Sequence, residues 1–184
     1  MKIRAPYPVD RLKLPAAGWR SQRLRYRQLH EDDWQVTWEM DSDPQVMRYI
    51  RDPAEDPAHH RQEYRQRFMH SGLHRHLYAI EWQQQSGMLG WVLLRPTDDR
   101  QWIEVGYRLM RRCWGQGIAT EAAAAALEIA FQRWRVDRVM AVTHPENQPS
   151  QRVLDKLGFS DQGLTDAFYD CQTRLYVLAA PANN

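Results

Sequence analysis

The chain has 184 residues, of which 43% are hydrophobic and 26% are charged. These values are ordinary for a globular protein and exclude the disordered and fibrous classes. The formal net charge of +2 is too small to indicate a nucleic-acid or membrane partner. Cys113 and Cys171 are widely separated and fit neither a disulfide framework nor a zinc site, so we expect a reducing, cytoplasmic setting.

The N-terminal stretch, residues 1–20, contains Pro6, Pro8, Pro15 and Gly18, which together predict an irregular arm. Its basic residues are not followed by a continuous apolar run, so we do not expect a signal peptide. No segment approaches the roughly 20 apolar residues of a membrane helix. Residues 21–180 contain neither a repeat nor a linker, and we expect them to form a single domain.

The first half of that domain is predicted to contain strands and short helices. Leu24, Tyr26 and Gln28 alternate with two arginines, which predicts a strand, and the acidic residues 31–33 open a helix. Asp43-Pro44 opens a second helix, and aromatic spacing predicts a third over Arg61–His70. Residues 76–82 and 88–94 flank a turn and predict a hairpin, which a strand over residues 102–109 follows.

The second half alternates between helices and strands. We expect helices from Gly117 to Trp134 and over Ser150–Leu157, and strands over residues 138–143, 159–164 and 174–178. The order of the expected elements, with strands in the first half and alternating strands and helices in the second, predicts an α/β (or α+β) domain built on one sheet.

Two glycines, Gly115 and Gly117, stand where the strand over residues 102–109 gives way to the alanine-rich helix. Glycines allow backbone amides to approach an anion, and a helix N-terminus favours negative charge, so this loop predicts a pyrophosphate site. Arg111 and Arg112 add positive charge beside it. A Walker loop and the dinucleotide fingerprint both fail to match. Two glycines alone are equally typical of a tight turn without a ligand.

Three blocks of sequence resemble the GNAT acetyltransferases: residues 104–107 (EVGY), 114–122 (WGQGIATEA) and 147–159 (NQPSQRVLDKLGF). More narrowly, they resemble the RimJ/RimL branch, which contains ribosomal-protein N-terminal acetyltransferases. The similarity spans about Arg23 to Leu178. Trp114 departs from the Arg or Gln that the wider superfamily carries at its position, but tryptophan is common there in this branch.

The resemblance implies a single mixed, mostly antiparallel sheet of about seven strands, flanked by helices, with a splay between the fourth and fifth strands. Acetyl-CoA would bind at that splay as cosubstrate, without a metal. Backbone groups and side chains at thirteen positions would bind it: Leu109, Met110, Arg111, Arg112, Trp114, Gly115, Gln116, Gly117, Ile118, Ala119, Thr120, Asn147 and Ser150.

Acetyl transfer to an amine needs a base for the amine proton and a hydrogen-bond donor for the oxyanion. Glu104 is the candidate base, because relatives place a catalytic carboxylate on this strand; a strand glutamate paired with an arginine is the alternative. The candidate oxyanion donor is the backbone amide of Leu109 or Met110.

The departing CoA thiolate also needs a proton. Many GNAT enzymes use a tyrosine seven residues after the motif asparagine, but Leu154 stands at that position. Ser150 is therefore the candidate acid, with a helix-capping serine as the alternative reading, and Tyr169 is a second candidate.

Other residues suggest sites without fitting them. The pairs His59-His60 and His74/His76 have no carboxylate or cysteine at ligand spacing, so we expect surface histidines and no metal. We expect Cys113 to be a buried loop cysteine. Trp34 and Trp38, four residues apart, are candidates for the wall of an acceptor pocket.

The expected function is N-acetylation of a primary amine by acetyl-CoA, through direct attack in a ternary complex. The acceptor stays open between a small molecule and a peptide or protein N-terminal α-amine. The alternative function is a noncatalytic, regulatory acyl-CoA-binding domain. We expect a monomer or homodimer, with no nucleic-acid and no membrane partner.

Overall fold

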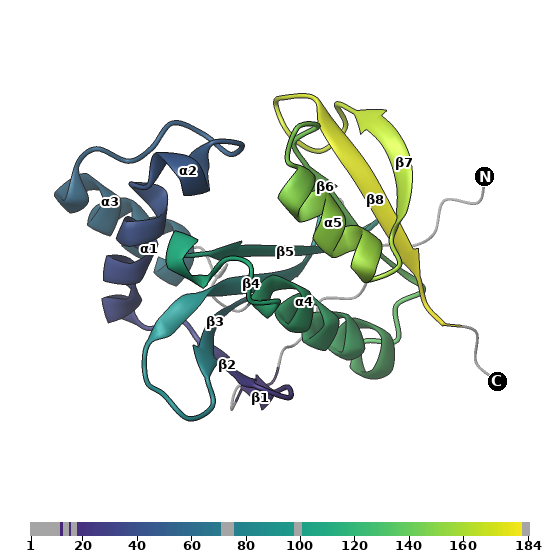
Figure 1. The fold of residues 1–184 in the computed structure, drawn as a ribbon, viewed down its shortest axis with the longest axis horizontal. Coiled ribbons are helices and arrows are strands. Elements are labelled where there is room, and N and C mark those ends of the chain that lie inside the picture. The colour runs from purple at the N-terminus through teal and green to yellow at the C-terminus, as the bar shows by residue number, and fades with distance from the viewer. Residues whose placement is uncertain (1–11, 13–14, 16–17, 71–75, 98–100, 182–184) are drawn as a thin grey trace.

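The computed structural model describes Leu12, Pro15 and residues 18–70, 76–97 and 101–181. They form one sheet of eight strands in the order β1-β2-β3-β4-β5-β6-β8-β7, with helices packed on it (Figure 1). The strands are β1 (Trp19–Arg20), β2 (Leu24–Gln28), β3 (Leu77–Trp82), β4 (Met88–Pro96), β5 (Ile103–Leu109), β6 (Arg138–Thr143), β7 (Ser160–Thr165) and β8 (Thr173–Ala179).

Two of the short helices begin where an aspartate side chain caps a first-turn amide. Asp43 and Asp56 accept hydrogen bonds from the amides of Gln45 and Ala58, and a proline follows each of these aspartates. The helical elements are η2 (Glu31–Asp33), α1 (Trp34–Asp41), α2 (Pro44–Met47), α3 (Pro57–Tyr64), η3 (Arg65–His70), η5 (Arg111–Cys113), α4 (Ile118–Glu128), η6 (Ile129–Arg133) and α5 (Gln148–Lys156).

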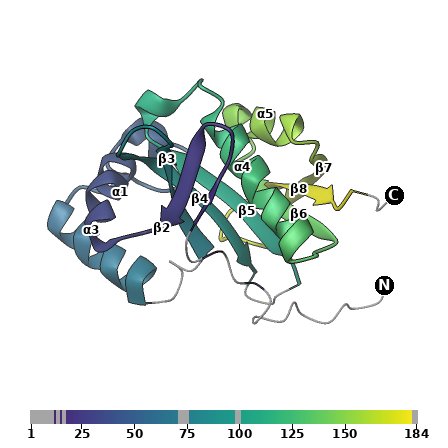
Figure 2. The same ribbon diagram turned by 90° about the horizontal axis from the view of Figure 1, so that it is seen from below.

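The two faces of the sheet carry different helices. Successive side chains of a strand point to opposite faces. On β5, Tyr107 bonds to Ser150 of α5, whereas the next residue, Arg108, pairs with Asp41 of α1. The helices α5 and α1 therefore cover opposite faces, and α4 packs against α5 and against β4 and β5. Figure 2 shows α4 and the α1–α3 group separated by the strands.

The alanines of α4 bring this helix close to the sheet. Ala122, Ala123 and Ala126, together with Ala130 of the following η6, have no exposed surface and lie in one core with the apolar side chains of the central strands. Alanine favours the helix and has the smallest side chain that does so, which lets backbone and sheet approach closely. The N-terminus of α4 is thereby fixed relative to β5.

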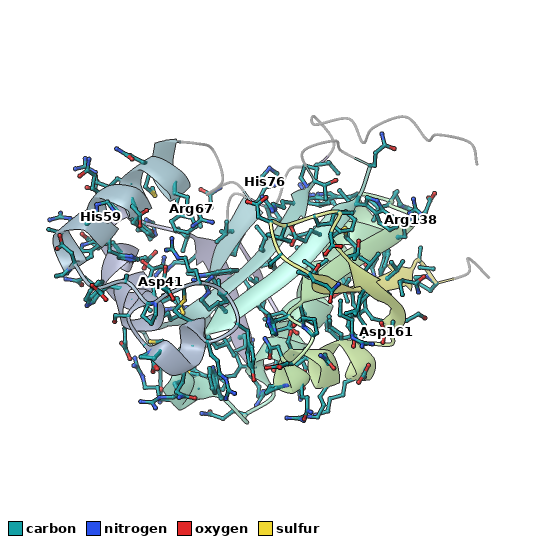
Figure 3. All side chains as sticks on the ribbon, turned by 90° about the horizontal axis from the view of Figure 1, so that it is seen from above. Asp41, His59, Arg67, His76, Arg138 and Asp161 are labelled. Atoms are coloured by element: carbon teal, nitrogen blue, oxygen red, sulfur yellow. The ribbon has the colours of Figure 1, made fainter. Side chains whose placement is uncertain are left out.

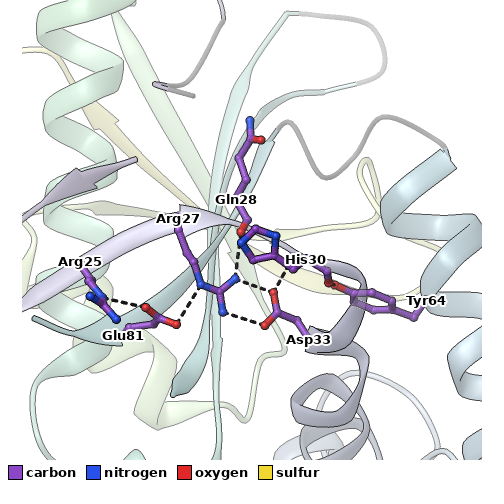
Figure 4. A network of polar contacts seen from close by, with 7 residues as sticks. All are labelled: Arg25, Arg27, Gln28, His30, Asp33, Tyr64 and Glu81. Carbon is purple, nitrogen blue, oxygen red and sulfur yellow. Dashed lines mark hydrogen bonds and ion pairs between the residues drawn. The ribbon is translucent and has the colours of Figure 1, made fainter. Parts of the chain in front are cut away.

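A chain of ion pairs around two buried carboxylates ties β2 and β3 to the helical layer (Figure 4). Glu81 accepts hydrogen bonds from Arg25 Nε at 2.8 Å and from Arg27 Nε at 2.9 Å. The terminal nitrogens of Arg27 then donate to Asp33 of η2 at 2.7 and 2.8 Å. Each carboxylate has cationic partners, so its burial does not leave an uncompensated charge.

The expected mixed, mostly antiparallel sheet with flanking helices is confirmed, with two corrections of detail. Trp19–Arg20 pairs with Tyr26 and Arg25, so the end of the expected irregular arm is a strand and the sheet has eight strands rather than seven. A strand of two residues is too short to show the alternation of apolar and polar residues by which strands are predicted from sequence. The third helix begins at Pro57 instead of Arg61, because Asp56 caps it. The first part of the expected arm, residues 1–11, lies outside the described residues.

Candidate active site

The sheet comes apart between β5 and β6, its single parallel neighbours. In the described part of the chain these strands share one pair, Glu104 with Met140, whereas β4 and β5 share seven pairs. Figure 1 shows β6 and β8 running at a steep angle to β5. We call the gap between β5 and β6, on the Leu109 side of the Glu104–Met140 pair, the splay. It corresponds to the expected splay between the fourth and fifth strands when the two-residue β1 is not counted.

Register decides which backbone amide of β5 faces the splay. The Met110 amide donates to the Leu89 carbonyl at 3.0 Å, so it belongs to the β4 ladder and is excluded as the oxyanion donor. Leu109 is the next residue back and lies opposite Gly90. Hydrogen-bonded and non-hydrogen-bonded pairs alternate along an antiparallel ladder. The Leu109 amide therefore points away from β4, toward the splay.

A glycine loop follows this amide. Gly115 and Gly117 both have φ of 75°, a left-handed conformation that side-chain-bearing residues rarely adopt. Gly117 is the N-cap of α4 and no side chain caps this helix, so the first-turn amides of Ile118, Ala119 and Thr120 remain for an anion. Trp114 Nε1 donates to the Leu109 carbonyl at 3.0 Å, and Gln116 donates to the Arg112 carbonyl at 3.1 Å. The first bond holds the loop against the end of β5, and the second ties the loop to η5.

The two arginines expected to add charge beside the loop point elsewhere. Arg111 pairs with Asp43 at 3.0 Å, and Arg112 pairs with Glu39. Both carboxylates belong to the α1–α2 segment. The positive charges are thus balanced by acids that the sequence did not place nearby, since the pairs are about seventy residues apart in the chain.

Glu104 and Tyr169, two of the three candidate catalytic residues, lie in contact. Glu104 is buried, with 5% of its surface exposed. Its Oε2 accepts from Arg95 Nε at 2.9 Å and its Oε1 accepts from the Tyr169 hydroxyl at 2.7 Å. Burial and the neighbouring Glu104 charge raise the pKa of Tyr169 to about 12. Tyr169 is therefore a neutral hydrogen-bond donor to the carboxylate near neutral pH.

Ser150, the third candidate, lies on the other face of β5. Its Oγ is 3.1 Å from the hydroxyl of Tyr107, and this hydroxyl also lies 3.2 Å from the Ser150 carbonyl. Asn147 caps α5, because its Oδ1 accepts from the Ser150 amide at 3.2 Å. Sequence reasoning missed Tyr107, although strand alternation after Glu104 would have placed it on the α4 face.

Glu104 and Ser150 thus reach the splay from opposite faces of the sheet. Glu104 and Arg108 are four residues apart on β5, so their side chains point to the same face. Ser150 bonds to Tyr107, whose side chain points to the opposite face. A group that entered between β5 and β6 would lie between them. This arrangement suits two reactants that approach one point from different sides.

Other expected residues serve the structure. Trp34 and Trp38 are covered by α3: Arg61 lies over the Trp34 ring at 5.3 Å, and His60 is 5.6 Å from Trp38, ring to ring. Cys113 is buried, as expected, and burial raises the pKa of its thiol.

No metal-binding cluster is present among the described residues: no group of three or more His, Cys, Asp or Glu side chains is placed to hold an ion. Figure 3 shows His59 at the outer end of the helical region. The expectation of a surface or loop histidine is wrong for His60, which is 3% exposed and lies 3.2 Å from the Thr37 hydroxyl, because α3 packs on α1. His74 lies outside the described residues. In the same described ranges, no helix is long and apolar enough to span a membrane.

The splayed sheet and the glycine loop at a helix N-terminus define an acetyltransferase of the GNAT fold. The family model described as Acetyltransferase (GNAT) domain matches residues 23–160. The chain belongs to the GNAT acetyltransferase family. It is 28% identical over 143 residues to the Uncharacterized N-acetyltransferase YnaD of Bacillus subtilis, which covers 78% of this chain and 82% of that relative.

Solved structures share the fold. A GNAT-family acetyltransferase from Bacillus anthracis superposes with a TM-score of 0.76 at 23% identity, over 89% of this chain and 98% of that one. RimL, the ribosomal L7/L12 α-N-protein acetyltransferase, was solved in complex with coenzyme A. It superposes with a TM-score of 0.69 at 17% identity, over 91% of this chain and 98% of its own.

Proposed function

We propose that this protein transfers the acetyl group of acetyl-CoA to a primary amine by direct attack in a ternary complex. The observation that carries the proposal is the splay, with the Leu109 amide directed into it and the glycine loop at its end. An extended pantetheine arm offers amides that can pair with a strand that has lost its neighbour. The coenzyme A in the RimL complex supports the same donor for this chain.

Donor binding follows from the backbone. The pyrophosphate binds the amides from Gly115 to Thr120, where two left-handed glycines and an uncapped helix N-terminus face an anion. The arm runs between β5 and β6 toward Asn147. The Oδ1 of Asn147 is used as a cap, so its side-chain amide group is the part that donates to the arm.

Glu104 accepts the amine proton, directly or through one water. Each of its oxygens accepts one hydrogen bond in the structure, and a carboxylate oxygen has a second lone pair for a further donor. Arg95 and Tyr169 hold the carboxylate in place. The amine nitrogen attacks the thioester carbon, and the Leu109 amide stabilises the resulting oxyanion.

The C–S bond then breaks and its electron pair leaves with sulfur. Ser150, on the face opposite Glu104, donates the proton to that thiolate. Tyr169 is the less suitable acid, because its hydroxyl already donates to Glu104. The products are the amide and CoA. The proton on Glu104 passes to solvent and Ser150 takes one proton back from solvent, so both side chains return to their starting states.

For the acceptor we infer a protein or peptide N-terminal α-amine. Structures with this fold include the RimL enzyme and a ribosomal-protein-S5-alanine acetyltransferase from Vibrio fischeri. The exposed residues of the segment 48–56, between α2 and α3, offer an open surface beside α1 that an extended peptide end can reach.

The test is CoA release from acetyl-CoA with a panel of amines and peptides, using the wild type and Glu104→Gln. We expect turnover with an α-amine, and a loss of about 10²–10⁴-fold in kcat for Glu104→Gln with unchanged affinity for acetyl-CoA. The loss should shrink as pH rises, because the free amine fraction then grows without help.

Glu81→Gln is the matched control, because Glu81 is equally buried and paired with arginines but lies on β3. It should keep the wild-type rate. A wild type that binds acetyl-CoA but turns over no amine would favour the noncatalytic alternative. Full activity of Glu104→Gln would place the base elsewhere.

A further inference from the structure

The turn between β1 and β2 is bound to the N-terminus of α4 (Figure 2). Glu121, in the first turn of α4, accepts hydrogen bonds on Oε1 from the Ser21 hydroxyl and the Arg23 amide, both at 2.7 Å. Its Oε2 accepts from Arg23 Nε at 2.7 Å. Three bonds thus join segments about a hundred residues apart, next to the glycine loop.

The guanidinium of Arg23 reaches the loop itself. Both of its terminal nitrogens lie 3.1 Å from the Gln116 carbonyl. One of them is 3.5 Å from the point that a Cβ on Gly117 would occupy. A guanidinium carries five N–H groups, and these contacts use one on each nitrogen. One N–H on each terminal nitrogen is left beside the loop.

The charges around the loop require such a cation. Glu121 places a negative charge at a helix end meant for an anion. Burial alone would raise the pKa of Glu121, but the hydrogen bonds from Ser21 and Arg23 hold it below its ordinary value, so the carboxylate is ionised. Arg111 and Arg112 are paired with Asp43 and Glu39. Arg23 is also ion-paired, with Glu121, but among the described arginines it is the one whose guanidinium contacts the loop backbone between Gly115 and Gly117.

We propose that Arg23 is a cofactor-binding residue, whose free N–H groups bind the pyrophosphate of acetyl-CoA while Glu121 and Gln116 hold the guanidinium in position. The inference rests on the proposed donor site. The pyrophosphate is favoured over the 3′-phosphate because Arg23 lies against Gly117, the residue that opens the amide cradle. A side chain fixed before binding loses less conformational freedom when the ligand arrives.

Calorimetric titration with CoA and with dephospho-CoA, which lacks only the 3′-phosphate, tests the assignment. Arg23→Gln should raise Kd about tenfold or more for both ligands, since a charge-assisted hydrogen bond to phosphate is lost. It should also lower the slope of log Kd against log salt. Arg23→Lys, which keeps the charge, should recover most of the affinity and of that slope.

Arg25→Gln is the matched control. It removes the same charge two residues further along the chain, on β2, but Arg25 pairs with Glu81 of β3 instead of with α4, so CoA affinity should not change. A wild-type Kd in Arg23→Gln would overturn the proposal, as would an unchanged salt slope. A penalty that disappears with dephospho-CoA would overturn the pyrophosphate assignment. A wild type that binds no CoA would instead refute the proposed donor site.

Discussion

Tyr107 and Ser150 form a hydrogen-bonded pair whose proton arrangement matters for the proposed acid. Burial raises the pKa of Tyr107 to about 12, against the opposing effect of its bond to Ser150. The phenol is therefore neutral at ordinary pH and has one proton to donate. This proton can go to the Ser150 carbonyl at 3.2 Å or to Ser150 Oγ at 3.1 Å. In the second arrangement the serine's own proton is left to point at the sulfur in the splay. Tyr107 is then a positioning residue for Ser150.

We expect Tyr107→Phe and Ser150→Ala each to lower kcat while the KM for acetyl-CoA stays the same. The double variant should be no slower than Ser150→Ala, because Tyr107 acts only through the serine. The Tyr107→Phe loss should be constant from about pH 6 to pH 9, since a pKa raised above its ordinary value keeps the phenol protonated throughout that range. Steady-state kinetics over this range measures all three variants.

Tyr64→Phe is the control, because it removes a buried hydroxyl that bonds to the His30 carbonyl on another part of the fold. It should leave kcat unchanged. Independent, multiplicative losses in the double variant would show that Tyr107 does not act through Ser150.

At the scale of elements, the start of α5 combines a structural and a binding role in one residue. Asn147 caps the helix through Oδ1, and Pro149 follows within the first turn. The cap fixes the position of Ser150 relative to β5. The side-chain amide of the same asparagine is left to donate to the pantetheine arm, so the two roles use different atoms and can be separated.

Asn147→Asp is expected to keep the helix cap and lose the amide donor. Aspartate caps helices about as well as asparagine, so the Tm should stay near that of the wild type, while the Kd for CoA rises about tenfold. Asn147→Ala should lose both functions and destabilise the fold by about 1 kcal/mol. Thermal melts and CoA titrations measure the two effects; wild-type CoA affinity in Asn147→Asp would assign Asn147 a capping role alone.

Sequence patterns predicted elements that carry their own signals. The hairpin of β3 and β4 has two largely apolar runs around a polar turn, and the start of α4 has its glycines. Contacts between distant segments have no such signal: Arg95 meets Glu104 because β4 and β5 pair in one register, and Asp43 captures Arg111 across the fold. Motif positions indicated Glu104 and Ser150, but their partners depend on that packing.

At the scale of the whole molecule, the sheet consists of two parts that meet at one residue pair. β1 to β5 form one antiparallel part and β6, β8 and β7 form the other, joined through Glu104 and Met140. The alternation of strands and helices predicted an α/β sheet, and the family resemblance implied the splay, whereas the strand order was not predicted. The length over which two strands stay paired depends on helices packed on both faces, which a local pattern does not encode.

The most direct test of the account is the binding of CoA to the intact protein, measured by calorimetry on the wild type and on Gly117→Asp. We expect saturable binding of one CoA per chain by the wild type. Aspartate at a left-handed position would bring strain and a negative charge to the phosphate site, so this variant should lose most of the affinity. An absence of binding at millimolar CoA, or equal affinity in both proteins, would contradict the assignment of the splay and the glycine loop as the acetyl-CoA site.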